Sequence, residues 1–201
     1  MNSPFRSSRT IFPGTLFLAA AVAGPALAAE EWTVLPDQSR IGFVAYQSGQ
    51  PVEGSFREFA AEIVFDPEDV DGSRVEVEID TASITTGHGD RDATLRSSSL
   101  FDVERWPTAR FVSDELVHNG GEVYEAHGEL TIRDVTMEVV LPFELAVGEH
   151  PDQAGTLLAE AAGELTISRL EFGVGQGDFE STSTVGDEVV IRIEIEATRP
   201  G

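Results

Sequence analysis

The sequence predicts an all-β protein, an antiparallel β-barrel of about eight strands with one or two short helices. Apolar and polar residues alternate in run after run, as in strands with one buried and one wet face. Several runs are long enough for strands of about 30–40 Å at roughly 3.3 Å per residue. Short turns containing glycine, such as 120–121 and 186–187, separate them. Long one-sided strands joined in this way are typical of a sheet closed into a barrel.

The first residues have the pattern of a secretory signal peptide. Arg6 and Arg9 precede a short apolar run over 11–23, and Ala26-Leu27-Ala28 forms an A-x-A cleavage signal. The apolar run is too short for a stable membrane span. We therefore expect 1–28 to be a cleaved signal peptide and 29–201 to be a single exported domain, without stable membrane insertion.

Six runs show the two-residue period of strands most clearly. They are residues 41–46, 74–80, 124–133, 139–147, 157–167 and 188–197. Gly128 and Gly163 fall on the predicted inward faces, where a glycine either leaves room inside the barrel or permits a sharp bend. An eight-stranded barrel is wide enough to hold a single small ligand.

Two stretches break this period. Residues 88–98 predict a short helix, with Asp90 as its N-cap, and residues 168–172 predict a short helical turn. The glycine-rich stretch 173–178 lacks the glycine spacing of a dinucleotide-binding motif. We expect it to be a flexible loop near a barrel mouth.

The charge excludes several classes of function. The net charge is −23, all cations are arginine, and cysteine is absent. Such a surface repels nucleic acid and anionic lipid headgroups. Lysine Schiff-base, thiol and disulfide chemistry are excluded by composition. We interpret the acidity as adaptation to a saline environment, with arginine-rich codon bias of a GC-rich genome as the alternative.

Metal and catalytic motifs are not evident. The four histidines lack ligand spacing. The acidic stretch 66–72 resembles a calcium loop, but Pro67 takes the first ligand position. No serine lies in a nucleophile elbow. We therefore expect no metal, no cofactor and no enzymatic activity.

The charged cluster in the predicted helix has two interpretations. Arg91, Asp92 and Arg96 could form local ion pairs that support the helix, which is the interpretation we favour. Alternatively, Arg91 and Arg96 could receive the polar or anionic head of a ligand.

Four blocks of the sequence resemble the YceI family. They are WTVLPDQSRIGF (32–43), VEGSFREFAAEIVFDP (52–67), TASITTGHGDRDATLRSSSLFDVERWPTARF (81–111) and HGELTIRDVTMEVVLPFEL (127–145). The third block is the most specific, and the resemblance covers about residues 31–197. One departure is Asp134, where the family often has glycine.

The resemblance implies a lipocalin-like barrel around a long apolar tunnel, export to the bacterial periplasm, and binding of polyisoprenoid lipids or isoprenoid quinones. The segment 88–107 would cross the barrel mouth. Arg91 and Asp92 would lie at the entrance or lock this segment to a neighbouring strand, and Arg96 would belong to the same polar mouth. The side chains then expected to line the tunnel are Phe43, Phe56, Phe65, Ile84, Leu95, Leu100, Phe101, Trp106, Leu130, Phe143, Leu165 and Phe172.

Three functions fit these features. The first, which we favour, is a periplasmic carrier or store of an isoprenoid lipid, monomeric or homodimeric, with the hydrophobic ligand as its partner. The second is an enzyme acting on a hydrophobic substrate, which would place ionisable groups in the cavity. The third is a structural or stress protein whose barrel is filled by its own side chains.

Overall fold

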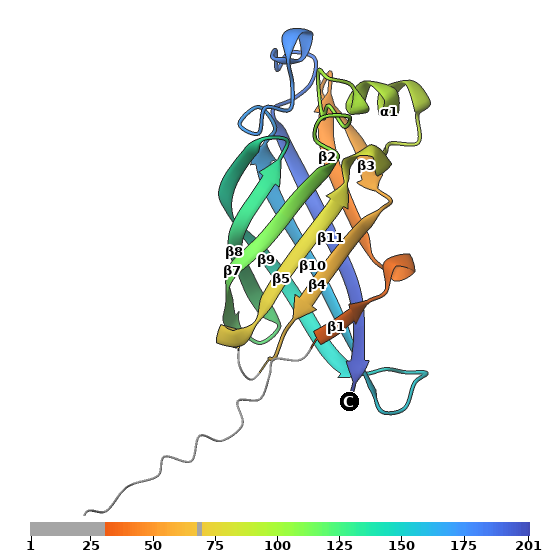
Figure 1. Cartoon of the computed structure of the whole chain (residues 1–201), viewed down its shortest axis with the longest axis vertical. Coiled ribbons are helices and arrows are strands. Elements are labelled where there is room, and N and C mark those ends of the chain that lie inside the picture. Colours follow the sequence, from red (N-terminus) through yellow and green to blue (C-terminus); the bar gives the residue numbers. More distant parts are fainter. Residues whose placement is uncertain (1–30, 68–69) are drawn as a thin grey trace, which may run out of the picture.

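The computed structural model describes residues 31–67 and 70–201, and the predicted signal peptide lies outside these residues. Eight antiparallel strands form a closed barrel (Figure 1). In spatial order they are β1 (Glu31–Val34), β4 (Phe59–Val64), β5 (Arg74–Asp80), β7 (Thr108–Gly120), β8 (Val123–Ile132), β9 (Val135–Glu149), β10 (Thr156–Ser168) and β11 (Glu188–Pro200). The ring closes because β1 pairs with β4 on one side and with β11 on the other. The predicted fold class is therefore confirmed.

A second set of strands branches from the ring. β2 (Arg40–Gln47) and β3 (Gln50–Phe56) form a hairpin, and β6 (Ile84–Thr85) pairs with the end of β3. The hairpin turn places Ser48 and Gly49 at φ 50° and 76°, the paired positive values of the tight turns that match strand twist. β11 pairs with β1 near the C-terminal end of β11 and with β2 closer to its start. At one end of the barrel, the β2–β3 hairpin therefore stands beside β11 in place of β1.

We call this end the upper end, as it is drawn in Figure 1. Two segments cover it. The first, residues 86–107, is the crossover segment; it contains α1 (Gly89–Arg96), the one α-helix among the described residues. The second is the 169–187 loop, which contains the 3-10 turn η4 (Gly177–Phe179). Three further 3-10 turns are η1 (Pro36–Gln38), η2 (Val70–Gly72) and η3 (Thr81–Ser83).

The interior divides into two packed clusters. At the lower end, Trp32 and Phe65 are each 3% exposed, and the Trp32 indole Nε1–H donates to the Phe65 carbonyl at 3.0 Å. At the upper end, Phe172 and Val174 from the 169–187 loop pack with Leu100 from the crossover segment. Both covering segments are therefore anchored by buried apolar side chains.

The faces of β8 and β9 follow the predicted alternation. In β2, by contrast, the four consecutive residues 41–44 are all buried, so this strand has no wet face there. Three other local predictions also need correction. Asp90 is not the N-cap of α1: His88 occupies that position, without a side-chain capping bond. The 173–178 stretch is more ordered than a free loop, since Val174 is 6% exposed and the Gln176 N–H donates to the Ser99 carbonyl at 2.8 Å. The two inward glycines mark close backbone approaches. A Cβ at Gly163 would lie 2.6 Å from the Pro142 carbonyl oxygen.

Candidate functional site

The barrel encloses two cavities that meet in its middle. The upper cavity has a volume of about 570 Å³ and the lower cavity about 160 Å³. Four side chains line both, so the two cavities adjoin along the barrel axis: Ile41, Ile79, Leu130 and Ile191. Each comes from a different strand, and each lies on the inward face that its alternation predicts.

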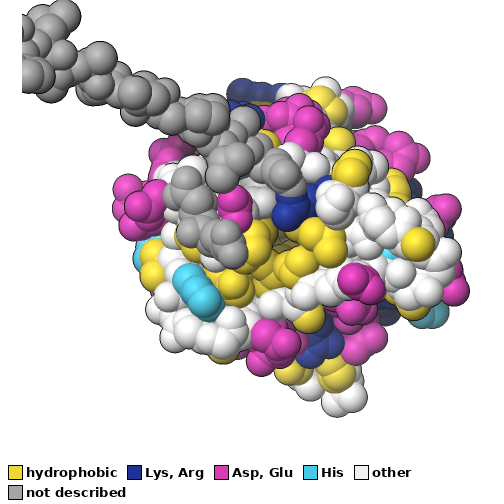
Figure 2. All heavy atoms as spheres, turned by 90° about the horizontal axis from the view of Figure 1, so that it is seen from below, with side chains coloured by type: hydrophobic (Ala, Val, Ile, Leu, Met, Phe, Trp, Pro, Cys, Tyr) yellow, Lys and Arg dark blue, Asp and Glu magenta, His cyan; other side chains and the backbone are white. Residues whose placement is uncertain are grey.

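The lower cavity is entirely apolar. Inward faces of the barrel strands supply its wall, and small side chains such as Ala61, Ala126, Ala159 and Ala161 leave the space open. Figure 2 shows hydrophobic side chains gathered round a hollow at this end, with acidic side chains round the outer edge. Water gains no hydrogen bonds from such a wall, and apolar surface that covers it is stabilised at roughly 25 cal/mol per Å².

The upper cavity is apolar with a polar border. Its aromatic wall is built from Phe43, Phe56 and Phe101, whose ring centroids are 6.0 Å (Phe43–Phe56) and 5.9 Å (Phe56–Phe101) apart. The aromatic rings thus join the β2–β3 hairpin to the crossover segment. The polar lining residues are Tyr46, Gln47, His88, Asp90, Arg91, Thr94 and Arg169.

Most of the predicted tunnel residues do line this space. Phe65, Phe143 and Leu165 line the lower cavity, and Leu130 lines both. Those in the upper cavity are Phe43, Phe56, Leu95, Leu100 and Phe101. Their placement is what a ligand contact requires; whether they contact a ligand stays a prediction.

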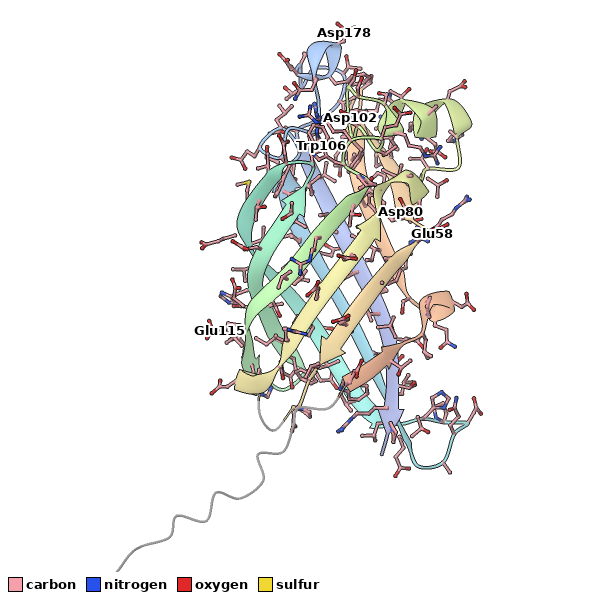
Figure 3. The ribbon with its side chains drawn as sticks, viewed as in Figure 1. Glu58, Asp80, Asp102, Trp106, Glu115 and Asp178 are labelled. Carbon is pink, nitrogen blue, oxygen red and sulfur yellow. The ribbon has the colours of Figure 1, made fainter. Side chains whose placement is uncertain are left out.

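Three predicted tunnel residues line neither cavity. Ile84 is fully buried (0% exposed) in the short strand β6. Phe172, 2% exposed, packs within the upper core cluster. Trp106 lies at the upper end (Figure 3), stacked between the guanidinium groups of Arg105 and Arg133, 4.4 and 4.3 Å from its ring centroid. These positions are structural because core packing and cation–π stacking already occupy the side chains.

Asp92 ties helix α1 to β6 and to the first residue of the crossover segment. The side chain is 7% exposed, and its carboxylate accepts from the Thr86 N–H and hydroxyl, both at 2.7 Å, and from the Thr85 hydroxyl at 3.0 Å. The Thr86 hydroxyl bond is the main reason that the pKa of Asp92 lies below its usual value, although burial opposes the shift. Asp92 is therefore a scaffold residue and does not line the cavity.

Arg96 has the same structural task. Its guanidinium donates to the Ala82 and Ile84 carbonyls, each at 2.7 Å, and so ties the end of α1 to the residues before it. Of the predicted polar mouth, only Arg91 lines the upper cavity. The charged cluster thus divides into two scaffold residues and one cavity residue. Asp92 and Arg96 lie on the side of α1 that contacts β6, whereas Arg91 lies on the side that borders the cavity.

Sequence reasoning missed two arginines. Arg169 lines the upper cavity and is 4% exposed. Arg133, at φ 57° in the β8–β9 turn, donates to the carbonyls of Leu100 and Gly173. It therefore fastens the crossover segment to the 169–187 loop, and we call it the Arg133 clamp. Their partners are backbone carbonyls distant in sequence, so no local motif marks them.

Metal binding and membrane-spanning helices have no support in the described part of the chain. Residues 31–67 and 70–201 hold no group of three or more His, Asp or Glu side chains placed to bind a metal ion. No helix within those ranges is long and apolar enough to cross a membrane. The other ionisable side chains in the upper cavity, besides the two arginines, are Tyr46, His88 and Asp90, and all three are exposed.

Comparison with known proteins places this barrel in a family. The family model for the YceI-like domain matches residues 32–197. The chain belongs to the YceI-like family. A UPF0312 protein of Photorhabdus laumondii is 36% identical over 159 residues, covering 77% of this chain and 82% of that protein. A UPF0312 protein of Azotobacter vinelandii is 30% identical over 181 residues, covering 88% of this chain and 91% of that one.

Solved structures show the same YceI-like architecture. BcnA of Burkholderia cenocepacia has a TM-score of 0.73 at 31% identity, over 81% of this chain and 98% of its own. A YceI protein of Campylobacter jejuni has a TM-score of 0.69 at 27% identity, over 76% and 87%. A polyisoprenoid-binding domain from Saccharophagus degradans, implicated in plant cell wall breakdown, has a TM-score of 0.63 at 13% identity, over 84% and 98%, and shares the fold.

Proposed function

We propose that this YceI-like protein binds one long-chain polyisoprenoid lipid or isoprenoid quinone in its barrel tunnel and carries or stores it in the periplasm. The observation that supports this most directly is the space inside the barrel, two adjoining cavities whose shared and lower walls are apolar. A barrel filled by its own side chains would leave no such space. The signal-peptide pattern of residues 1–28 is the reason for proposing the periplasm.

The binding energy would come mainly from burial of the chain. Each CH₂ group removed from water contributes about 0.8 kcal/mol, so one five-carbon prenyl unit contributes about 4 kcal/mol before the costs of immobilisation. An apolar wall discriminates little between chain types. Selectivity would therefore arise from tunnel length and from the polar groups bordering the upper cavity.

The test is to identify what the protein carries. The processed protein is purified without detergent and extracted with organic solvent, and the extract is analysed by mass spectrometry. We expect a prenyl lipid or quinone close to one per chain. An empty extract combined with no uptake of added quinone would contradict the proposal, and a chemically altered added lipid would favour an enzyme.

A pair of variants then asks whether the tunnel is the site. Ala161 lines the lower cavity, whereas its neighbour Ala162 is exposed on the outer face of β10. Ala161→Trp should shorten the space for the lipid chain and weaken lipid binding at least tenfold. Excluding about two CH₂ groups from the cavity is enough for a change of this size. Ala162→Trp should bind like the wild type. Equal binding by both folded variants would show that the lipid lies elsewhere.

A further inference from the structure

The wall of the upper cavity contains a buried cation. Arg169 follows β10 directly and is 4% exposed. Its guanidinium donates to the carbonyls of Gly186, Val174 and Val185 at 2.7, 2.8 and 2.9 Å. These bonds use three of the five N–H donors of the group. They fix the guanidinium in one orientation without neutralising its charge.

No carboxylate in the described part of the chain balances that charge directly. Among the described residues, Arg169 forms no ion pair within 4.0 Å. Asp187 acts on it only at longer range, and its carboxylate accepts from the Ser168 hydroxyl and the Leu170 N–H. Burial lowers the pKa of Arg169, the usual response of a desolvated cation. A buried charge in this position gains strongly from an opposite charge that enters beside it.

A second cation borders the same cavity. Arg91, on α1, is half-buried, and within the described part of the chain it has no hydrogen-bond or ion-pair partner. By contrast, Arg110 and Arg192 on the outer wall each pair with a glutamate, at Glu76 and Glu164. In a chain with almost three acidic residues for each basic one, a partnerless arginine on a cavity wall is unusual.

The other charged groups of the cavity do not cancel these two. Asp90 would repel an anion, but it is exposed beside water, where its effect is screened. His88 is also exposed and adds positive charge only when protonated. Arg169, held in the low-dielectric wall, acts on its surroundings with less screening. The upper cavity therefore presents two guanidinium groups at one end of an otherwise apolar lining.

We propose that the upper cavity holds the anionic oxygen head of a lipid, with Arg169 and Arg91 donating to it and the apolar chain running down toward the lower cavity. This assignment rests on the proposed function and specifies it further. The ligand class is a long apolar chain with a carboxylate or phosphate head, both of which accept charge-assisted hydrogen bonds from guanidinium groups.

Three probes with one chain and different heads test the assignment: geranylgeraniol, geranylgeranoic acid and geranylgeranyl phosphate. Affinities are measured for delipidated wild-type protein by competition with a fluorescent lipid. We expect the acid and the phosphate to bind at least tenfold more tightly than the alcohol, the gain typical of one hydrogen bond to a charged group. The tighter of the two anionic probes then identifies the head.

Variants assign the effect to residues. Arg91→Met and Arg169→Met should each reduce the preference for acid over alcohol about tenfold and leave the alcohol affinity within about twofold. Arg192→Met is the control, because Arg192 lies on the outer wall, pairs with Glu164 and lines neither cavity. Its preference should equal that of the wild type.

The outcomes separate the two proposals. Equal wild-type affinity for the alcohol and both anions, or an unchanged preference in Arg91→Met and Arg169→Met, would overturn the anionic-head assignment while leaving lipid binding intact. Failure of folded wild-type protein to bind any of the three probes would instead count against lipid binding itself. If Arg169→Met loses the loop and all affinity, the ratio in Arg91→Met, whose side chain has no partner to lose, decides.

Discussion

Replacing Asp92 by alanine tests whether a single carboxylate holds α1 against β6 and the start of the crossover segment. The change removes three hydrogen bonds of 2.7–3.0 Å from Thr85 and Thr86 and leaves the partly buried Thr86 N–H without this acceptor. Hydrogen bonds to a charged group contribute about 1.5–3 kcal/mol, and they are not additive within one network. We therefore expect a loss of about 3 kcal/mol in the free energy of unfolding.

The assay is thermal and urea unfolding of the wild type, Asp92→Ala and Asp90→Ala. For a domain of this size, a loss of about 3 kcal/mol corresponds to a fall in Tm of roughly 6–12 °C. Asp90, two residues earlier on the same helix, is exposed and its side chain accepts no hydrogen bond among the described residues. Asp90→Ala should therefore change stability by less than about 0.5 kcal/mol.

The pH dependence provides a second readout. Because the pKa of Asp92 is lowered in the folded state, its contribution is complete above the unfolded value of about 3.9 and is lost as the pH falls through the lower folded value. The stability difference between the wild type and Asp92→Ala should be constant from about pH 5 to 8 and shrink below about pH 4. Equal stability of the Asp92 and Asp90 variants, or a difference that persists unchanged in acid, would refute this account.

Three further predictions concern the rest of the fold. Arg133→Met should lower stability by about 1–3 kcal/mol and speed proteolysis within the 169–187 loop, because the clamp to the crossover segment is lost; unchanged cleavage would contradict the clamp. Gly128→Ala should cost about 1–3 kcal/mol, since the added Cβ meets the backbone of β7, whereas Gly148→Ala, with open space, should be tolerated. Added NaCl should raise Tm, because salt screens the repulsion between acidic side chains. Glu160→Gln should stabilise by about 0.2–1 kcal/mol at low salt only, since Glu160 lies directly opposite Glu196 and the two like charges repel. A Tm that is flat or falls with salt would exclude the saline interpretation.

The barrel and most of its lining could be predicted from the sequence because strand alternation is a local property. Residues such as Ile41, Leu130 and Ile191 each stand in a run that assigns them to the inward face. The same rule assigned Phe43, Phe143 and Leu165 correctly to cavity walls. Ile84, Trp106 and Phe172 lie outside the long strands and were expected in the tunnel only from the family resemblance; they line neither cavity. Outside an alternating strand, an apolar side chain is as readily core as lining.

The polar part of the site depended on the tertiary structure. The charge pattern around α1 left the roles of Arg91, Asp92 and Arg96 open, because helix rotation decides which side chain meets the barrel and which meets the cavity. Arg169 carries no sequence signal, since its partners are backbone carbonyls and any residue supplies a carbonyl. The sequence by itself thus determined a barrel with an apolar interior, because the alternation of apolar and polar side chains is a local property of each strand. Only the folded chain decided where a buried charge faces the tunnel, because that depends on which distant loops are brought against one wall.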